Sequence, residues 1–187
     1  MKISVYTGVS LDGFIARENG ALDWLPGGES EEYSAEEEDY GYYSFWNSVD
    51  ALMMGRFTFD KVLSFKKWPY GNKPVYILSH SLKKLPAHLP ETVCLKSGVP
   101  SDIYRELASA QVQHLYLDGG RTIQSFLREG LVNELILTVI PILIGSGIRL
   151  FGSLQHDIKL KHLETQAFES GLVQSTYKVL NSSYPIS

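Results

Sequence analysis

Short runs of glycine and hydroxyl residues that follow apolar segments of this sequence could bind the phosphates of a ligand. Gly119 and Gly120 follow the apolar run 115–117 and open a segment with helical character. Two glycines let the backbone approach a ligand closely, and a helix N-terminus offers unpaired N–H groups to a pyrophosphate. The alternative is a tight turn between a strand and a helix.

Two further segments of this kind occur earlier in the chain. Arg56 and Thr58 follow Gly55 after an apolar run, and an arginine can bind a phosphate through two N–H groups. Ser79 follows another apolar run, and its hydroxyl suits a ribose or a ribose phosphate. The alternatives here are a helix cap with a surface arginine and a simple turn. Together the strand ends predict a dinucleotide site, because a dinucleotide needs a pyrophosphate site and a second anchor for its adenosine half.

The elements that must position these residues alternate along the chain. Apolar runs flanked by turns alternate with helical patterns, which predicts a largely parallel sheet with helices on its faces and a final antiparallel hairpin around the turn 169–171. The predicted strands are 3–7, 51–54, 74–78, 93–95, 115–117 and 134–140, and the hairpin strands are 159–168 and 172–180. The predicted helices are one that opens at Ser34 to Glu37 and carries Tyr40, Tyr43 and Trp46, one over 58–64, one over 102–110 capped by Ser101, and one over 121–129 ended by Gly130.

Composition and charge bound the class of protein. The chain has 187 residues, of which 44% are hydrophobic and 20% charged, which predicts one globular domain over residues 1–187. The net charge of −4 argues against a nucleic-acid partner or an anionic membrane surface. The single cysteine, Cys94, lies in a run that predicts a buried strand and a structural role. No signal-peptide pattern occurs at the N-terminus, so we expect a cytoplasmic protein.

Other classes of catalytic site find no support in the sequence. The histidines show no metal-ligand spacing and no GxSxG motif occurs, so we expect neither a metal nor a nucleophilic triad. The first strand is followed by a long loop over residues 9–24 and not by a GxGxxG motif. Such a loop could fold over a nicotinamide ring and exclude water.

Several short motifs, taken in their order along the chain, resemble one known family. They are Ser10-Leu-Asp-Gly-Phe-Ile15, Trp24, Asp50-Ala-Leu-Met-Met-Gly-Arg-Phe-Thr58, Tyr76-Ile-Leu-Ser79, Leu117-Asp-Gly-Gly-Arg121 and Leu137-Thr-Val-Ile-Pro141 leading to Gly145-Ser-Gly147. With them the chain resembles the dihydrofolate-reductase-like superfamily, and within it the stand-alone relatives of the reductase domain of bacterial riboflavin biosynthesis. The resemblance implies a three-layer α/β fold with a mostly parallel central sheet, helices on both faces and a C-terminal antiparallel hairpin.

The resemblance also implies NADPH as the cofactor and assigns residues to it. Gly55, Arg56 and Thr58 match the motif at the adenosine phosphate and the pyrophosphate, and Ser79 matches a residue near the adenosine ribose. The glycine pair, Gly119 and Gly120, matches the pyrophosphate site, and the helix beside it opens with Arg121, Thr122 and Ile123. Gly8 and Ile15 match positions that line the nicotinamide.

The substrate side is assigned in the same way. The carboxylate that binds the pterin in folate-reducing members corresponds to Asp39, with Glu36, Glu37 and Glu38 as alternative registers. Asp39 and Asp12 are the candidate proton donors. Asp23 replaces the proline that precedes the family's tryptophan, and Asp118 supplies an acid before the glycine pair, as in the riboflavin-type branch. Trp24 matches the tryptophan of the active-site loop, and we place Tyr43, Phe59 and Pro141 with it on the substrate side.

These assignments predict an NADPH-dependent reductase of a small heterocyclic or ribosylaminopyrimidine-type substrate, similar to 5-amino-6-(5-phosphoribosylamino)uracil reductase. A dihydrofolate-reductase-type activity is the alternative within the enzyme class. A nucleotide-binding protein without turnover is the alternative of another class. The resemblance further implies a homodimer.

Overall fold

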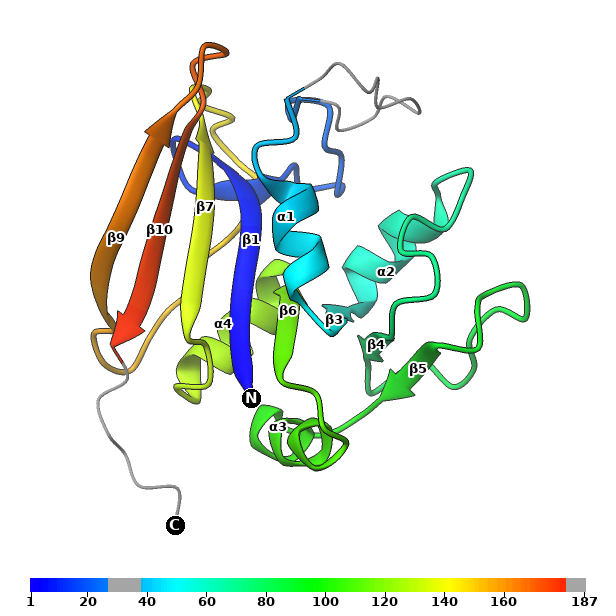
Figure 1. The fold of residues 1–187 in the computed structure, drawn as a ribbon. Coiled ribbons are helices and arrows are strands. Elements are labelled where there is room, and N and C mark those ends of the chain that lie inside the picture. Colours follow the sequence, from blue (N-terminus) through cyan, green and yellow to red (C-terminus); the bar gives the residue numbers. More distant parts are fainter. Residues whose placement is uncertain (27–37, 181–187) are drawn as a thin grey trace.

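An eight-stranded sheet runs through the molecule in the order β5-β4-β3-β6-β1-β7-β10-β9 (Figure 1). The computed structural model describes residues 1–26 and 38–180. The strands from β5 to β7 pair in parallel, and β10 and β9 pair antiparallel at the end of the sheet. Their bounds are β1 Lys2–Ser10, β3 Ala51–Gly55, β4 Val75–Leu78, β5 Val93–Lys96, β6 His114–Asp118, β7 Glu134–Ile140, β9 Lys159–Ala167 and β10 Val173–Leu180.

Two pairs of helices cover opposite faces of the parallel strands (Figure 1). α1 (Tyr42–Ser48) and α2 (Arg56–Leu63) pack on one face, and α3 (Pro100–Ser109) and α4 (Gly120–Arg128) on the other. A small second sheet pairs β2 (Phe14–Ala16) with β8 (Ile148–Arg149). The three-layer fold and the C-terminal hairpin predicted from the sequence are therefore confirmed.

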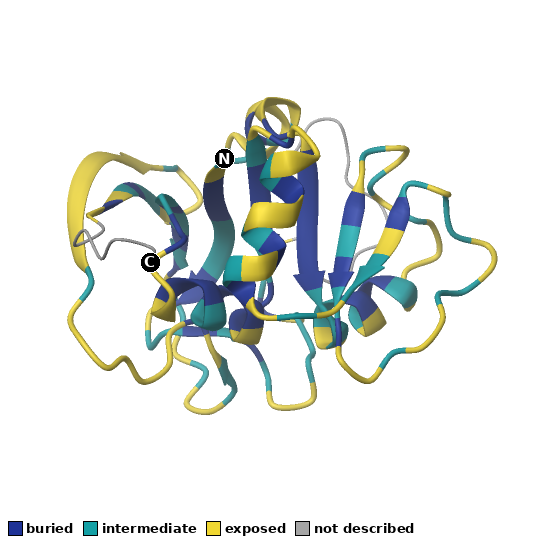
Figure 2. Cartoon of the chain, turned by 90° about the horizontal axis from the view of Figure 1, so that it is seen from below, coloured by how far each residue is buried: buried dark blue, intermediate teal, exposed yellow. Residues whose placement is uncertain are grey.

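The central strands are apolar on both sides because both sides are covered. Met53 and Met54 are adjacent in β3, so they point to opposite faces, and both are fully buried. Figure 2 shows this contrast between the buried middle of the sheet and the exposed β9 at its edge. Continuous apolar runs thus mark the strands that carry the predicted phosphate-binding segments at their ends.

Three predictions of local structure were wrong. The helix that carries Tyr43 and Trp46 begins at Tyr42, and Tyr40 precedes it with a left-handed φ of 53°; Ser34 and Glu37 lie outside the described residues. Ser101 does not cap its helix, which begins one residue earlier with a proline at its first position. Cys94 is exposed, and β5, which carries it, is an edge strand of the sheet.

Within the described part of the chain, no helix has the length and apolar character that a membrane span requires.

Candidate functional site

The three predicted phosphate-binding segments meet at one edge of the sheet. β4, β3 and β6 are neighbours, with Gly55 in register with Leu78 and Met54 in register with Asp118. Because these strands are parallel, the residues that follow them lie at the same carboxyl edge, where open α/β sheets bind ligands. The sequence prediction that the three segments form one site is consistent with this register.

The first turns of α2 and α4 are in close contact, because a glycine before each helix packs against a threonine of the other helix. A Cβ on Gly119 would approach the hydroxyl oxygen of Thr58 to less than 3.0 Å, and a Cβ on Gly55 would approach that of Thr122 equally closely. Gly119 also has a φ of 89°, which side chains rarely adopt. Two helix N-termini, each with unpaired N–H groups, are therefore held side by side.

Gly120 brings the same edge against the small second sheet. A Cβ there would lie 2.9 Å from the carbonyl oxygen of Arg149 and 3.0 Å from Cδ1 of Ile15. Ile15, assigned to the nicotinamide, thus packs directly on Gly120. Ile123 is fully buried in the core beneath it. Thr122 is also buried, so these two residues shape the helix while Arg121 remains exposed.

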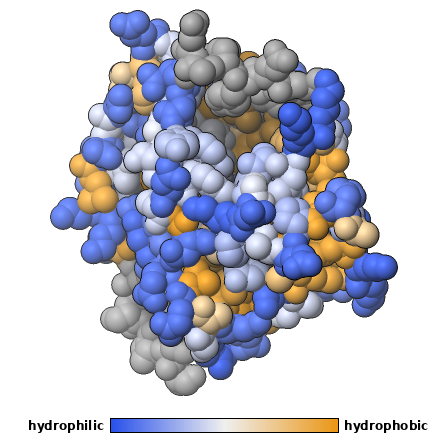
Figure 3. Space-filling model, turned by 45° about the vertical axis from the view of Figure 1, so that its right-hand side comes forward, coloured by the Kyte–Doolittle hydropathy of each residue, from blue (hydrophilic) through white to orange (hydrophobic). Residues whose placement is uncertain are grey.

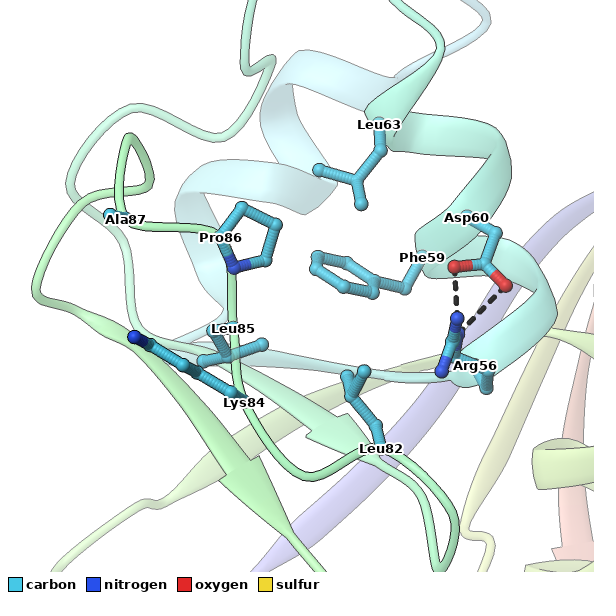
Figure 4. Close-up of a pocket in the computed structure, with 9 residues that line it drawn as sticks. All are labelled: Arg56, Phe59, Asp60, Leu63, Leu82, Lys84, Leu85, Pro86 and Ala87. Carbon is cyan, nitrogen blue, oxygen red and sulfur yellow. Dashed lines mark hydrogen bonds and ion pairs between the residues drawn. The ribbon is translucent and has the colours of Figure 1, made fainter.

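Arg56 stands at the first position of α2, beside a hollow. Its Nε lies 2.7 and 2.8 Å from the two carboxylate oxygens of Asp60. A hollow of about 430 Å³ lies between α2 and the segment 82–87, with Phe59, Leu82 and Leu85 among the residues that line it (Figure 4). Figure 3 shows hydrophobic surface on this side of the molecule, between hydrophilic side chains. Three charged side chains, Arg56, Asp60 and Lys84, therefore line this hollow together with apolar ones.

The hydroxyl of Ser79 organises the turn that follows β4. Ser79 is buried, and its Oγ accepts hydrogen bonds from the N–H groups of Ser81 and Leu82 at 3.3 and 3.1 Å. His80 Nδ1 lies 3.0 Å from the hydroxyl of Ser97 on the neighbouring loop. Ser79 therefore fixes the loop at the edge of the site through its side chain.

Asp118 is the ionisable residue that ends β6 at this edge of the sheet. It lies two residues after Tyr116 in β6, so both side chains point to the face covered by α1 and α2. Burial raises the pKa of Asp118 from 3.8 to about 6, although its carboxylate accepts a 2.7 Å hydrogen bond from the N–H of Gly119. Burial, and then the nearby Asp118 carboxylate, raise the pKa of Tyr70 and of Tyr116 well above 10.0. This carboxyl can hold a proton close to neutral pH.

The two predicted proton donors have different partners. The hydroxyl of Ser10 donates a 2.6 Å hydrogen bond to Asp12, and this bond, with the N–H groups of Gly145 and Ile144, lowers the pKa of Asp12. Asp12 thus ties the loop after β1 to the loop after β7. The carboxylate of Asp39 accepts hydrogen bonds from the N–H groups of Gly41 and Tyr43, both at 2.9 Å, and so caps α1.

A polar network that the sequence prediction missed holds the segment beside Asp39. The Gln174 amide nitrogen lies 3.0 Å from the Tyr40 carbonyl, 2.9 Å from the Thr138 hydroxyl and 3.1 Å from the Tyr6 hydroxyl. The Tyr6 hydroxyl in turn donates a 2.6 Å hydrogen bond to the Tyr40 carbonyl. Strands β1, β7 and β10 thereby fix the left-handed Tyr40. Nothing in the local pattern of β10 marks this glutamine as different from other half-buried polar residues.

The remaining residues predicted for the substrate side differ in how far they are exposed. Trp24 is 8% exposed and packs with Ile140 and Leu172, and its indole N–H has no partner among the described residues. Tyr43 is 70% exposed on α1, whereas Phe59 is 1% exposed and belongs to the core. Pro141 lies beside the hairpin turn, 3.7 Å from where a Cβ on Gly171 would stand. Of the three alternative registers for Asp39, Glu36 and Glu37 lie outside the described residues, and Glu38 is exposed.

Gly8 lies on the same face of the sheet as Asp118. Space there is restricted, because a Cβ on Gly8 would lie 2.9 Å from Cδ2 of Leu25 and 3.1 Å from Cδ1 of Ile140.

In residues 1–26 and 38–180, no three or more His, Cys, Asp or Glu side chains gather in a way that could hold a metal ion.

The comparisons with known proteins agree with this architecture. Residues 1–174 match the model of the RibD C-terminal domain family. The uncharacterized protein YwjB of Bacillus subtilis (strain 168) is 34% identical over 170 residues, which cover 89% of this chain and 92% of YwjB. The crystal structure of “Putative riboflavin biosynthesis protein” from Shewanella sp. PV-4 is similar with a TM-score of 0.87 and 38% identity, over 96% of this chain and 99% of that one.

A more distant similarity concerns the fold alone. The dihydrofolate reductase of Enterococcus faecalis, in complex with NADP(H), has a TM-score of 0.60 and 14% identity over 95% of this chain and 96% of that one. The chain belongs to the RibD C-terminal domain family and has the dihydrofolate-reductase-like fold. The resemblance inferred from the sequence motifs is confirmed.

Replacing Gly119 by alanine should lower the free energy of unfolding by about 2 kcal/mol or more, because the variant combines an unfavourable φ with a clash against Thr58. Gly20→Ala is the matched control, since Gly20 has a φ of 80° and nothing within 4 Å. Urea denaturation measures both. Adding Thr58→Ala should recover part of the stability lost in Gly119→Ala but none of that lost in Gly20→Ala. Equal losses of stability in Gly119→Ala and Gly20→Ala would contradict the clash.

Asp118 should make the protein less stable as pH rises. Its folded-state pKa lies above the 3.8 of an unfolded aspartate, so its protonated form favours the folded state, and this contribution is lost between about pH 4 and 6. Asp118→Asn should remove the effect, so the variant gains about 2–3 kcal/mol relative to wild type between pH 4 and pH 7.5. Denaturant melts across this range measure the difference. A constant difference between the two proteins would show that the Asp118 carboxyl is not perturbed.

Proposed function

We propose that this chain is an NADPH-dependent reductase that acts on a small heterocyclic or ribosylaminopyrimidine-type substrate. The observation that carries the proposal is the pair of helix N-termini held together by the contacts of Gly55 and Gly119 with threonines. A Cβ at either position would clash with the threonine of the other helix, so glycine at both positions allows the two helix N-termini to lie this close together. This arrangement fits a pyrophosphate, which needs close approach to the backbone and several N–H donors.

The adenosine half would lie toward α2 and the turn after β4. Arg56 contacts Asp60 through Nε, which leaves its two terminal nitrogens available to a 2′-phosphate. Ser79 and the turn that it organises border this region. We assign Arg56 and Thr58 to the phosphates and Ser79 to the ribose side. The apolar hollow beside Arg56 supports an adenosine anchor at this end of the site.

The nicotinamide would lie toward Ile15 and Gly8, on the other side of the glycine pair. When bound there, the cofactor would supply a hydride to a C=N or C=O carbon of the substrate. The task of the chain is to align the two partners and exclude water. Ile15 packs on Gly120, and the loop that contains Trp24 closes the region near Gly8, so both walls are apolar.

Among the described residues, Asp118 is the best candidate for the accompanying proton. It is only partly exposed, it faces α1, and its pKa of about 6 lets a fraction of the molecules carry the proton near neutral pH. Asp12 suits this role poorly, because its hydrogen bonds favour the ionised form. Asp39 stays a candidate for substrate binding, since its carboxylate stands at the start of α1 beside Tyr40.

The first test is cofactor binding. We expect the protein to bind NADPH, followed by fluorescence or by melting temperature, and we expect Arg56→Ala to weaken NADPH about tenfold but NADH much less, because only NADPH carries the 2′-phosphate. Arg105→Ala, a surface arginine on α3 paired with Asp102, is the control. Equal losses for both cofactors would exclude a 2′-phosphate contact, and no response to either cofactor at millimolar levels would exclude the proposed function.

Substrate panels separate the alternatives once the cofactor binds. Loss of NADPH absorbance with a ribosylaminopyrimidine or another heterocycle supports a reductase activity of the riboflavin type. Loss that depends on dihydrofolate supports a folate-reducing activity instead. Binding without hydride loss across the panel would favour a nucleotide-binding protein without turnover.

We also propose that the chain forms a homodimer through the edge strand β9. Each residue of β9 is exposed, and an uncovered edge of this length is normally paired or protected. The bulge in its pairing with β10 places Lys161 and Glu164 on the same face, because their partners Lys178 and Thr176 are two residues apart. Two β9 strands related by a two-fold axis can therefore pair Lys161 with Glu164 of the partner subunit, twice.

Charge exchange tests this dimer. Lys161→Glu and Glu164→Lys should each weaken dimerisation about tenfold, because each places two pairs of like charges opposite one another. The double variant, or an equimolar mixture of the two single variants, should restore the dimer. Sedimentation velocity measures the stoichiometry, and a wild-type monomer or a mixture without recovery would contradict this interface.

A further inference from the structure

An exposed aromatic ring stands next to the proposed pyrophosphate site with no role in the core. Phe57, the second residue of α2, is 64% exposed. The guanidinium carbon of Arg121, the second residue of α4, lies 4.7 Å from the centre of this ring. The contact therefore bridges the first turns of the two helices that the glycine–threonine contacts hold together.

The two arginines at this edge are held in different ways. Arg56 uses the edge of its guanidinium group, where Nε contacts the Asp60 carboxylate, so an acid partly compensates its charge. Arg121 rests with its guanidinium over a neutral ring. A stacked guanidinium keeps its N–H groups in its own plane and available to an anion. Arg121 thus keeps both its full charge and its donors.

Position matters as much as charge for a long side chain. An exposed arginine samples many rotamers, and a ligand that needs one of them must order the side chain when it binds. The backbone positions of Phe57 and Arg121 are fixed relative to each other, because Thr58 is in contact with Gly119 and Thr122 with Gly55. The ring can therefore restrict Arg121 to the region in front of both helix N-termini.

We infer that Phe57 is a positioning residue that holds Arg121 ready to bind the pyrophosphate of the dinucleotide. The inference rests on the proposed function, because it needs a phosphate ligand at this edge. It assigns to Phe57 an effect on affinity that acts through Arg121 and not through contact with the cofactor. An aromatic residue in place of Phe57 should preserve this effect, whereas an aliphatic one should not.

A double-mutant cycle tests the inference. We expect Phe57→Leu to raise the Kd for NADPH about fivefold and Arg121→Gln to raise it about tenfold. The variant with both changes should bind within twofold of Arg121→Gln, because the ring has no effect once the arginine is gone. Phe57→Tyr should retain wild-type affinity. Phe65→Leu is the control, since Phe65 is also exposed, at 42%, and lies after the end of α2.

The outcomes separate this inference from the function on which it rests. Melting temperatures should be unchanged in the Phe57 and Arg121 variants, because both side chains are exposed. If Phe57→Leu costs the same factor with and without Arg121, the ring contacts the cofactor itself and the inference is wrong, while the cofactor site stands. If Phe57→Leu binds like wild type, the ring does not position the arginine. A wild-type protein that binds neither NADPH nor NADH would overturn the proposed function.

Discussion

The reciprocal contact between two glycines and two threonines is the constraint on which the site depends. Gly55 ends β3 and Gly119 directly follows its parallel neighbour β6, and each glycine leaves room for the threonine in the first turn of the opposite helix. The two helices lie on opposite faces of the sheet, so their N-termini could meet only at its edge. Close contact there needs small residues at the strand ends, and it places two sets of unpaired N–H groups together.

The burial that stabilises the sheet also sets the chemistry of its edge. Residues 115–117 of β6 are buried between helices on both faces of the sheet, and the next residue ends the strand. Asp118 occupies that position, and the same burial raises its pKa to about 6. Tyr70 and Tyr116 lie near Asp118, but their phenol groups carry no positive charge that would stabilise its ionised carboxylate. Asp118 can thus hold a proton because it stands where the buried part of β6 ends.

Much of the fold, and the meeting of the three strand-end segments at one edge of the sheet, could be predicted because the signals are local. Glycine pairs, strand periodicity and the hairpin turn each occupy a few consecutive residues, and parallel strand order brings their ends together. Cys94 was misjudged because an edge strand and a central strand have similar local sequences. The start of α1 depends on the Asp39 cap and on Tyr40, which the distant Gln174 holds. Such partners, 134 residues apart, leave no mark in the local pattern.

The two sides of the site therefore differ in how tightly the fold prescribes them. The edge to which we assign the phosphates is built largely from backbone N–H groups and from glycines whose Cβ would clash with Thr58 or Thr122. A ligand there would have to fit this geometry. The other side is built from side chains, among them Asp39, Gln174 and Trp24, whose positions depend on hydrogen bonds and loop contacts. Substitutions there would change these side-chain contacts without disturbing the strand ends. In the proposed reductase, the backbone would therefore set the phosphate side, and the side-chain half of the site would decide substrate preference.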